Sequence, residues 1–201
     1  MSRGKPDLSI ELLEVTLATF FDLAKDLTTK VDYRLVGTAA SLLHGVQLPV
    51  SDIDLLVRHR SDVDSFGAVL APFQCLVAPK WLPDAKQYYG NYSVNDIEIG
   101  FSTVEVDSDR DTIETYGSGP WLHFSKLLCG HYPVSAVALE LRLHTELHRN
   151  RPDRFEPILQ HLKTYGCNHD LMTRCIDSDC DLSNEYKALV NNMLSSAPKL
   201  N

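Results

Sequence analysis

The stretch YRLVGTAASLLHGVQLPVSDIDLLV, residues 33–57, decides the fold. Its first residues read as a short strand that ends at Gly37, and TAASLLH reads as a short helix that ends at Gly45. Pro49 lies in a loop because proline breaks a helix, and IDLLVRH then predicts a second, buried strand. Strand, short helix and strand in this order indicate an α/β domain.

Two aspartates lie at the start of the second strand. Residues two apart in a strand face the same side, with Cα atoms roughly 6.5–7 Å apart, so Asp52 and Asp54 project together while Ile53 and Leu55 pack on the other face. Two such carboxylates repel each other unless a cation lies between them. Carboxylate oxygens are the hard ligands that Mg²⁺ prefers, and a pair of divalent ions about 3.5–4 Å apart suits two such side chains.

Glu98 is a candidate third carboxylate, because it lies between two β-branched apolar residues in IEI. YSVNDIEIGFS alternates in polarity and predicts one longer strand over 91–101, with Asp96 and Glu98 on the same face. If this strand pairs beside strand 53–58, Glu98 completes a three-carboxylate site. Asp96 is the alternative, although Asn95 and Asp96 could equally form a turn.

Gly37 adds a feature that favours phosphate binding. A glycine between a strand and a helix lets backbone N–H groups approach a phosphate, and Thr38 adds a hydroxyl at the same point. Such corners are common, so this signal alone is weak. Together with the Asp-x-Asp pair that begins at Asp52, it favours a metal site over hydrated acids paired with Arg58 or Arg60.

The rest of the chain divides into an α/β part and a helical part. We expect residues 1–125 to form the α/β domain with an N-terminal helix, and residues 126–201 to form a helical C-terminal region. The further expected elements are a helix over 8–29, a helix from Ser61 to Pro72, a strand over 73–78, a loop over 80–91, and helices from Pro133 onward, over 152–166, near 168–176 and over 183–195.

Composition excludes several classes of protein. Asp and Glu outnumber Lys and Arg by 27 to 19, and the net charge of −8 argues against stable nucleic-acid binding. We find no signal peptide and no stretch close to the roughly 18 apolar residues of a membrane span, so we expect no membrane association. The five cysteines are odd in number and include no Cys-x-x-Cys, which indicates a reduced, cytoplasmic chain.

HTELH, residues 144–148, places two histidines one helical turn apart. A zinc-protease helix needs its glutamate directly after the first histidine or directly before the second. Here Glu146 stands between them, so we interpret this segment as a solvated helix face.

Three short motifs together resemble the nucleotidyltransferase superfamily of the polymerase-β type. They are Gly37-Thr38, then Asp52-Ile53-Asp54-Leu55, then Ile97-Glu98-Ile99. The chain is especially similar to small bacterial members such as aminoglycoside and lincosamide nucleotidyltransferases and their toxin–antitoxin relatives. The motifs cover residues 33–101, and a looser resemblance extends over 137–162.

Two departures from the family pattern stand out. Thr38 replaces the usual Gly or Ser, which keeps a hydroxyl and adds bulk. In the helical segment, small drug-modifying members often have Arg-Pro-Lys-Asp where this chain has RPDR at residues 151–154. Any role for Asp153 is therefore in doubt.

The resemblance implies an α/β nucleotidyltransferase fold, with a short mixed β-sheet flanked by helices and a C-terminal helical bundle. It implies an enzyme that uses a pair of Mg²⁺ ions to transfer NMP from an NTP to a hydroxyl of a small-molecule acceptor. Pyrophosphate would be released, and ATP, as the donor of AMP, is the first choice of NTP. Asp52, Asp54 and Glu98 would be catalytic and hold the metal. Gly37 and Thr38 would hold the β- and γ-phosphates.

Several alternatives stay open. The chain could be a toxin-like nucleotidyltransferase that acts on protein or tRNA, or a catalytically silent nucleotide-binding or partner-binding protein on the same fold. The base, the acceptor and the oligomeric state are not fixed by the sequence, and a homodimer is one alternative. The candidates for the triphosphate contact are Lys80, Lys126, Arg142 and Arg149.

Overall fold

The computed structural model describes residues 8–105, 112, 114–115 and 117–200. Its helices are α1 (Ile10–Leu23), α2 (Lys25–Thr28), α3 (Gly37–Leu43), α4 (Arg60–Val69), α5 (Gly119–Leu122), α6 (Leu139–His148), α7 (Pro152–Tyr165), α8 (His169–Ser178) and α9 (Asn184–Leu194). Its strands are β1 (Tyr33–Val36), β2 (Asp52–Val57), β3 (Gln74–Leu82), β4 (Gln87–Val94), β5 (Ile97–Ser102), β6 (Phe124–Cys129) and β7 (Tyr132–Val137).

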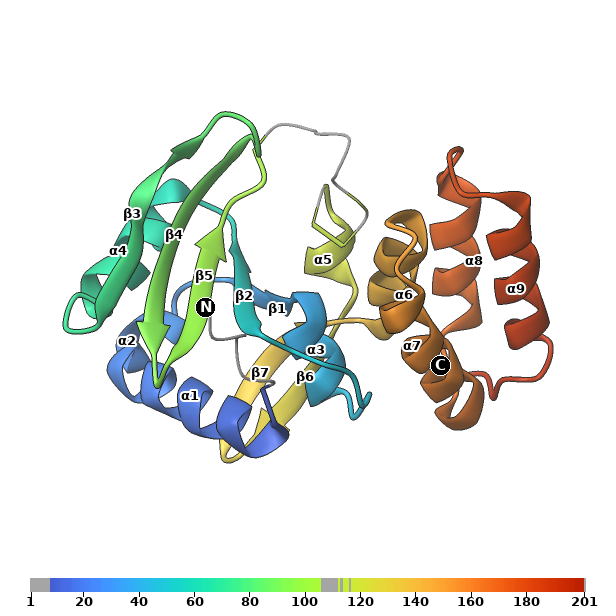
Figure 1. Cartoon of the computed structure of the whole chain (residues 1–201), viewed down its shortest axis with the longest axis horizontal. Coiled ribbons are helices and arrows are strands. Elements are labelled where there is room, and N and C mark those ends of the chain that lie inside the picture. Colours follow the sequence, from blue (N-terminus) through green and yellow to red (C-terminus); the bar gives the residue numbers. More distant parts are fainter. Residues whose placement is uncertain (1–7, 106–111, 113, 116, 201) are drawn as a thin grey trace, which may run out of the picture.

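The strands form one mixed sheet in the order β3-β4-β5-β2-β1-β7-β6 (Figure 1). β1 pairs antiparallel with β2, while β2 pairs parallel with β5 and β1 pairs parallel with β7. The parallel pairs join segments that are distant in sequence, as crossover connections require. The expected mixed sheet flanked by helices is confirmed.

One face of the central strands is covered by helices. Phe20 of α1, Phe66 of α4 and Phe101 of β5 pack together, with ring centroids 5.0–5.6 Å apart. Ile53 and Leu55 of β2 belong to the same buried cluster. Because side chains alternate along a strand, Asp52 and Asp54 lie on the opposite face, as the sequence predicted.

A second cluster of buried hydrophobic side chains lies among the C-terminal helices α6 to α9. α6 lies between α5 and α8, and every residue from Leu139 to Leu147 is buried (Figure 1). The expected C-terminal helical bundle is confirmed from Leu139 onward, whereas most of residues 126–137, also expected to be helical, belong to strands β6 and β7 of the sheet. The division of the chain into two domains stays a prediction. Among the described residues, no helix has both the length and the apolar character that crossing a membrane requires.

The stretch predicted as one strand over 91–101 is two strands. β4 ends at Val94, β5 begins at Ile97, and the two residues between them have positive φ, +53° at Asn95 and +62° at Asp96. Two central residues with φ > 0 form the tight hairpin turn that Asn and Asp tolerate best. The single-strand prediction was wrong because its polarity alternation continues across this turn.

Two other predicted boundaries were also wrong. The segment 80–91 is mostly strand, since β3 continues to Leu82 and β4 begins at Gln87, with Trp81 opposite Tyr88 across the hairpin. Aromatic cross-strand pairs of this kind stabilise a sheet. The helix expected from Pro133 begins only at Leu139, because β6 and β7 extend the sheet.

Candidate active site

The parallel pairing of β2 and β5 brings the predicted carboxylates together. Asp52 lies opposite Glu98 and Asp54 lies opposite Gly100 in the register. The predicted pairing of these strands is confirmed, so three carboxylates share one face of adjacent strands. Asp96 lies in the exposed turn before β5, so it is not a member of this group.

Gly37 lies directly beside Asp54. Val36 is opposite Asp54 in the β1–β2 ladder, and Gly37 follows it with a φ of +67°. A Cβ at Gly37 would lie 3.1 Å from Asp54 Oδ2. This position therefore needs glycine for its backbone conformation and for its close approach to the carboxylate.

Gly100 gives Asp54 room on its other side. A Cβ at Gly100 would lie 3.1 Å from Asp54 Oδ1 and 3.0 Å from the Tyr89 hydroxyl. Burial, followed by the charges of Asp54, Glu98 and Asp52, raises the pKa of Tyr89 to about 12. Asn91 Nδ2 donates a 3.1 Å hydrogen bond to Glu98 Oε2 and holds that carboxylate in place. Sequence analysis had not assigned Asn91 a role.

The pKa of Asp54 is raised to about 7. The largest cause is burial, followed by the negative charges of Asp52 and Glu114. The side chain keeps partial exposure on the cavity side, and in the described part of the chain Asp54 has no ion-pair partner. A raised pKa from clustered acids indicates a site where a cation would stabilise the ionised form.

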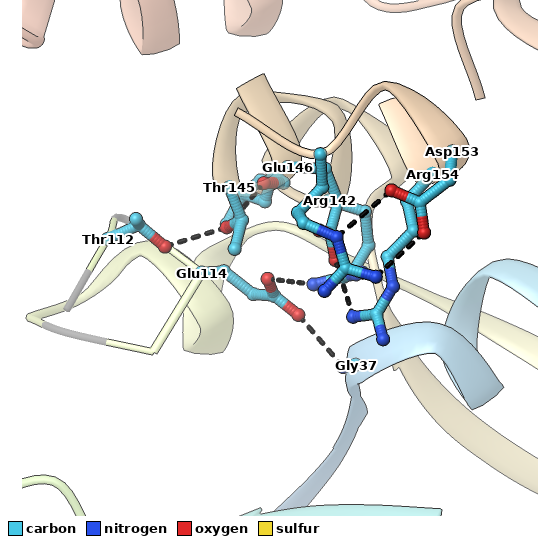
Figure 2. A network of polar contacts seen from close by, with 10 residues as sticks. Gly37, Thr112, Glu114, Arg142, Thr145, Glu146, Asp153 and Arg154 are labelled. Carbon is cyan, nitrogen blue, oxygen red and sulfur yellow. Dashed lines mark hydrogen bonds and ion pairs between the residues drawn. The ribbon is translucent and has the colours of Figure 1, made fainter. Parts of the chain in front are cut away.

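A buried network of polar residues lies beside this group (Figure 2). Gly37 N donates a 3.0 Å hydrogen bond to Glu114 Oε1, and the other Glu114 oxygen lies 2.5 Å from Arg142 Nη1. Arg142 also pairs with Glu146, and Arg154 lies 3.6 Å from the same Glu146 oxygen. Glu114, Arg142 and Glu146 are each at most 1% exposed. Sequence analysis missed Glu114 because it lies in a polar, turn-rich segment without periodicity.

Comparison with protein-family profiles and with curated protein sequences finds no match. Comparison with solved structures finds several matches. An antigenic nucleotidyltransferase-like protein from Paracoccidioides brasiliensis matches with a TM-score of 0.53 and 13% identity, over 97% of each chain. A candidate nucleotidyltransferase from Thermotoga maritima matches with a TM-score of 0.53 and 17% identity, over 77% of this chain and 94% of that one. The chain has a nucleotidyltransferase fold. The antibiotic-resistance factor ANT(2'')-Ia also matches, with a TM-score of 0.50 and 11% identity, over 89% of this chain and 95% of its own.

The structure distinguishes among the basic residues that are candidates for the triphosphate contact. Arg142 is buried between two glutamates, and Lys126 lies by another cavity, beside Asp32 and Arg34. Arg149 is exposed and lines the same cavity of about 170 Å³ as Gly37, Asp54 and Glu114. Arg149 is therefore the best placed of these candidates.

The nucleotidyltransferase resemblance implies a metal, and the donor set fits one in part. Asp52, Asp54 and Glu98 supply hard oxygen ligands, and a cation stabilises the ionised form of clustered acids. As placed, no three His, Cys, Asp or Glu side chains among the described residues are close enough to form a metal site. The assignment of these residues as ligands stays a prediction.

Proposed function

We propose that the chain is a metal-dependent nucleotidyltransferase that transfers NMP, most simply AMP from ATP, to a hydroxyl of a small-molecule acceptor and releases pyrophosphate. The observation that carries the proposal is the shared face of β2 and β5. It holds Asp52 and Asp54 opposite Glu98 and Gly100, with Gly37 directly beside Asp54. The pKa of Asp54 is raised by burial and by the neighbouring acids, as is common for carboxylates at functional sites.

In this proposal Asp52, Asp54 and Glu98 hold Mg²⁺, and Gly37 and Thr38 hold the β- and γ-phosphates. The bound metal would neutralise charge on the phosphates as the pyrophosphate leaves. Glu98 either coordinates the catalytic metal or accepts the proton of the acceptor hydroxyl. The Asn91 hydrogen bond keeps one Glu98 oxygen oriented for either task.

Two further side chains would act on the substrates. Arg149 is exposed at the cavity and would bind a phosphate, because a guanidinium can hold two phosphate oxygens at once. Tyr89 has a pKa of about 12, so it keeps its proton at neutral pH and can donate a hydrogen bond to a phosphate or to the acceptor.

The acceptor class rests on the fold likeness to the antibiotic-resistance factor ANT(2'')-Ia. A small molecule that carries hydroxyl groups is therefore the first acceptor class to test. The net charge of −8 makes a cationic acceptor easier to attract than an anionic one.

One contact favours the alternative of a catalytically silent nucleotide-binding protein. Glu114 accepts the Gly37 N–H that a phosphate would need. If this contact persists, the Gly37 N–H is not free to donate a hydrogen bond to the triphosphate, as the proposal requires.

Titration calorimetry with each NTP, with and without Mg²⁺, tests the proposal. We expect Mg²⁺-dependent binding of at least one NTP, and loss of that binding in Asp52→Ala/Asp54→Ala. Asp26→Ala/Asp177→Ala is the matched control, because it removes the same charge from exposed positions on α2 and α8. Absence of binding of every NTP would exclude the proposal. Binding without pyrophosphate release across a screen of hydroxyl acceptors would support the silent alternative.

A further inference from the structure

A second cavity lies on the far side of α6 from the candidate active site. Its volume is about 650 Å³, within the range of roughly 300–1,000 Å³ of small-molecule sites. Arg142 and Arg149 lie on one face of α6, toward the candidate site, while His144 and His148 line the large cavity. At 3.6 residues per turn these two pairs point to different sides of the helix. The other walls come from α5 and α8, on either side of α6 (Figure 1).

Two histidines in this cavity share one carboxylate oxygen. His144 Nε2 and His148 Nδ1 each lie 2.9 Å from Asp179 Oδ2. The other Asp179 oxygen accepts the backbone N–H groups of Asp181 and Leu182, at 2.9 and 3.0 Å. Asp179 is therefore fully engaged within the protein. Its function in the cavity is to hold the two imidazole rings.

Within the part of the chain that the structure describes, His148 and His144 each keep one ring nitrogen without a hydrogen-bond partner. The His148 side chain is 25% exposed and bonds only through Nδ1 within the described residues. His144 is buried, and its Nδ1 has no hydrogen-bond partner there. The sequence interpretation of HTELH as a solvated helix face was therefore wrong, because α8 and the Asp179 segment cover it. A ring nitrogen without a protein partner can donate a hydrogen bond to a ligand or accept one from it, depending on the tautomer.

One arginine, on α8, and one further histidine, the residue after α5, also line this cavity. Arg174 lines the cavity, is exposed, and makes a 3.3 Å hydrogen bond to the Asp170 carbonyl but no ion pair in the described part of the chain. His123 also lines the cavity, and its pKa is lowered, first by burial and then by the charge of Arg174. Asp181, at the exposed rim, is the other lining carboxylate. Arg174 and imidazole groups from two other elements therefore line the cavity, together with the carboxylates of Asp179 and Asp181.

We propose that this cavity binds a small molecule bearing a phosphate or carboxylate group, with the anion held between Arg174, His123 and the His148 ring that Asp179 orients. The guanidinium of Arg174 would supply the charge that attracts the anion, and the imidazole N–H groups would donate hydrogen bonds to it. The proposal does not depend on the proposed transferase function, since the cavity and the candidate active site lie on different faces of α6.

Titration calorimetry of the full chain with inorganic phosphate and with citrate, in EDTA and at constant ionic strength, tests the site. We expect saturable binding of at least one anion and, because a guanidinium contact is lost, about tenfold weaker binding in Arg174→Gln. Lys163→Gln removes the same charge from an exposed position on α7 outside the cavity and should change the affinity less than twofold, as roughly expected for a screened distant charge. Asp181→Asn should strengthen binding, because it removes the opposing charge at the rim.

Two further measurements distinguish anion binding in this cavity from anion binding at the candidate active site, and a carboxylate ligand from a phosphate ligand. Arg149→Gln alters the candidate active site and should leave the affinity unchanged. Tighter binding of citrate identifies a carboxylate ligand, and tighter binding of phosphate identifies a phosphate ligand. Absence of binding of both anions, or equal effects of Arg174→Gln and Lys163→Gln, would overturn the proposal. So would a loss of affinity confined to Arg149→Gln.

Discussion

The backbone amide of Gly37 donates a 3.0 Å hydrogen bond to a Glu114 carboxylate that is itself paired with Arg142. The resemblance assigns this N–H to a phosphate of the nucleotide. A phosphate and the Glu114 carboxylate are both anions, and they compete for the same donor. The cavity beside this contact measures about 170 Å³, below the size of ordinary ligand sites, so Glu114 must leave the amide before a triphosphate can bind.

Glu114→Gln should strengthen NTP binding. The amide side chain lacks the charge that repels the phosphates and that raises the pKa of Asp54. We expect a dissociation constant for Mg·ATP about tenfold lower, the equivalent of about 1.4 kcal/mol, by titration calorimetry. Glu105→Gln is the control, because Glu105 pairs with Arg60 at the surface. Weaker ATP binding in Glu114→Gln than in the control would show that Glu114 assists the nucleotide.

Asp54 should make the free energy of unfolding depend on pH. Its folded pKa of about 7 lies above the ordinary value of 3.8, so the folded state binds the extra proton between these values. The contribution of Asp54 to the free energy of unfolding is therefore highest below about pH 4. It falls as the pH rises to about 7 and stays constant above that value. The shift corresponds to at most about 4 kcal/mol, and water at the partly exposed carboxylate reduces it to about 1–3 kcal/mol.

Urea unfolding in EDTA at about pH 5 and about pH 8 measures this difference. Asp54→Asn should lose the Asp54 contribution, and at the higher pH it should be more stable than the parent chain. Excess Mg²⁺ should also weaken the pH dependence, because a cation favours the ionised carboxylate. An unchanged pH profile in Asp54→Asn would contradict the assignment of the raised pKa to this residue.

Gly37→Ala should impair both stability and nucleotide binding. Alanine at a φ of +67° costs about 1–2 kcal/mol, and its Cβ would meet Asp54 Oδ2 at 3.1 Å. Gly130→Ala is a matched control, with a φ of +60° and open space around the added Cβ. Thermal unfolding should show a loss in both variants, larger in Gly37→Ala. ATP titration should show a loss only in Gly37→Ala, and equal binding by the two variants would argue against a phosphate contact at Gly37.

Arg142→Met should be strongly destabilising. It leaves Glu114 buried without its cation and leaves Glu146 with only the more distant Arg154, a change that typically costs about 3–5 kcal/mol. Arg151→Met breaks an exposed pair with Asp153 and should cost at most about 1 kcal/mol. Urea unfolding measures both. Combining Arg142→Met with Glu114→Gln and Glu146→Gln should recover part of the loss, and no recovery would mean that Arg142 stabilises the fold through packing rather than charge.

The central strands and the acid pair could be predicted because their signals are local. Alternation places Asp52 and Asp54 opposite Ile53 and Leu55, and a glycine after β1 marks the corner beside them. Glu98 was also found locally, from its apolar neighbours. The turn at Asn95 and Asp96 was one of the two alternatives that the sequence offered, since Asn and Asp accept positive φ better than other non-glycine residues do.

The Glu114–Arg142 pair could not be predicted in the same way. Glu114 has no periodic neighbours, and Arg142 lies on a helix whose faces are all covered by other elements. A single sequence does not reveal which segment covers which face of a helix. The same reason explains the wrong interpretation of His144 and His148, whose partner Asp179 lies beyond the end of α8.

The sheet order has a consequence for the order in which the site forms during folding. β1, α3 and β2 are consecutive, so the Gly37–Asp54 contact closes over a short loop at little entropic cost. Glu98 reaches Asp52 only after the β3–β4–β5 segment has crossed over and joined β2 in parallel. Refolding should therefore produce the glycine corner early and the complete set of carboxylates late. Acquisition of metal affinity would then mark the completion of the central sheet.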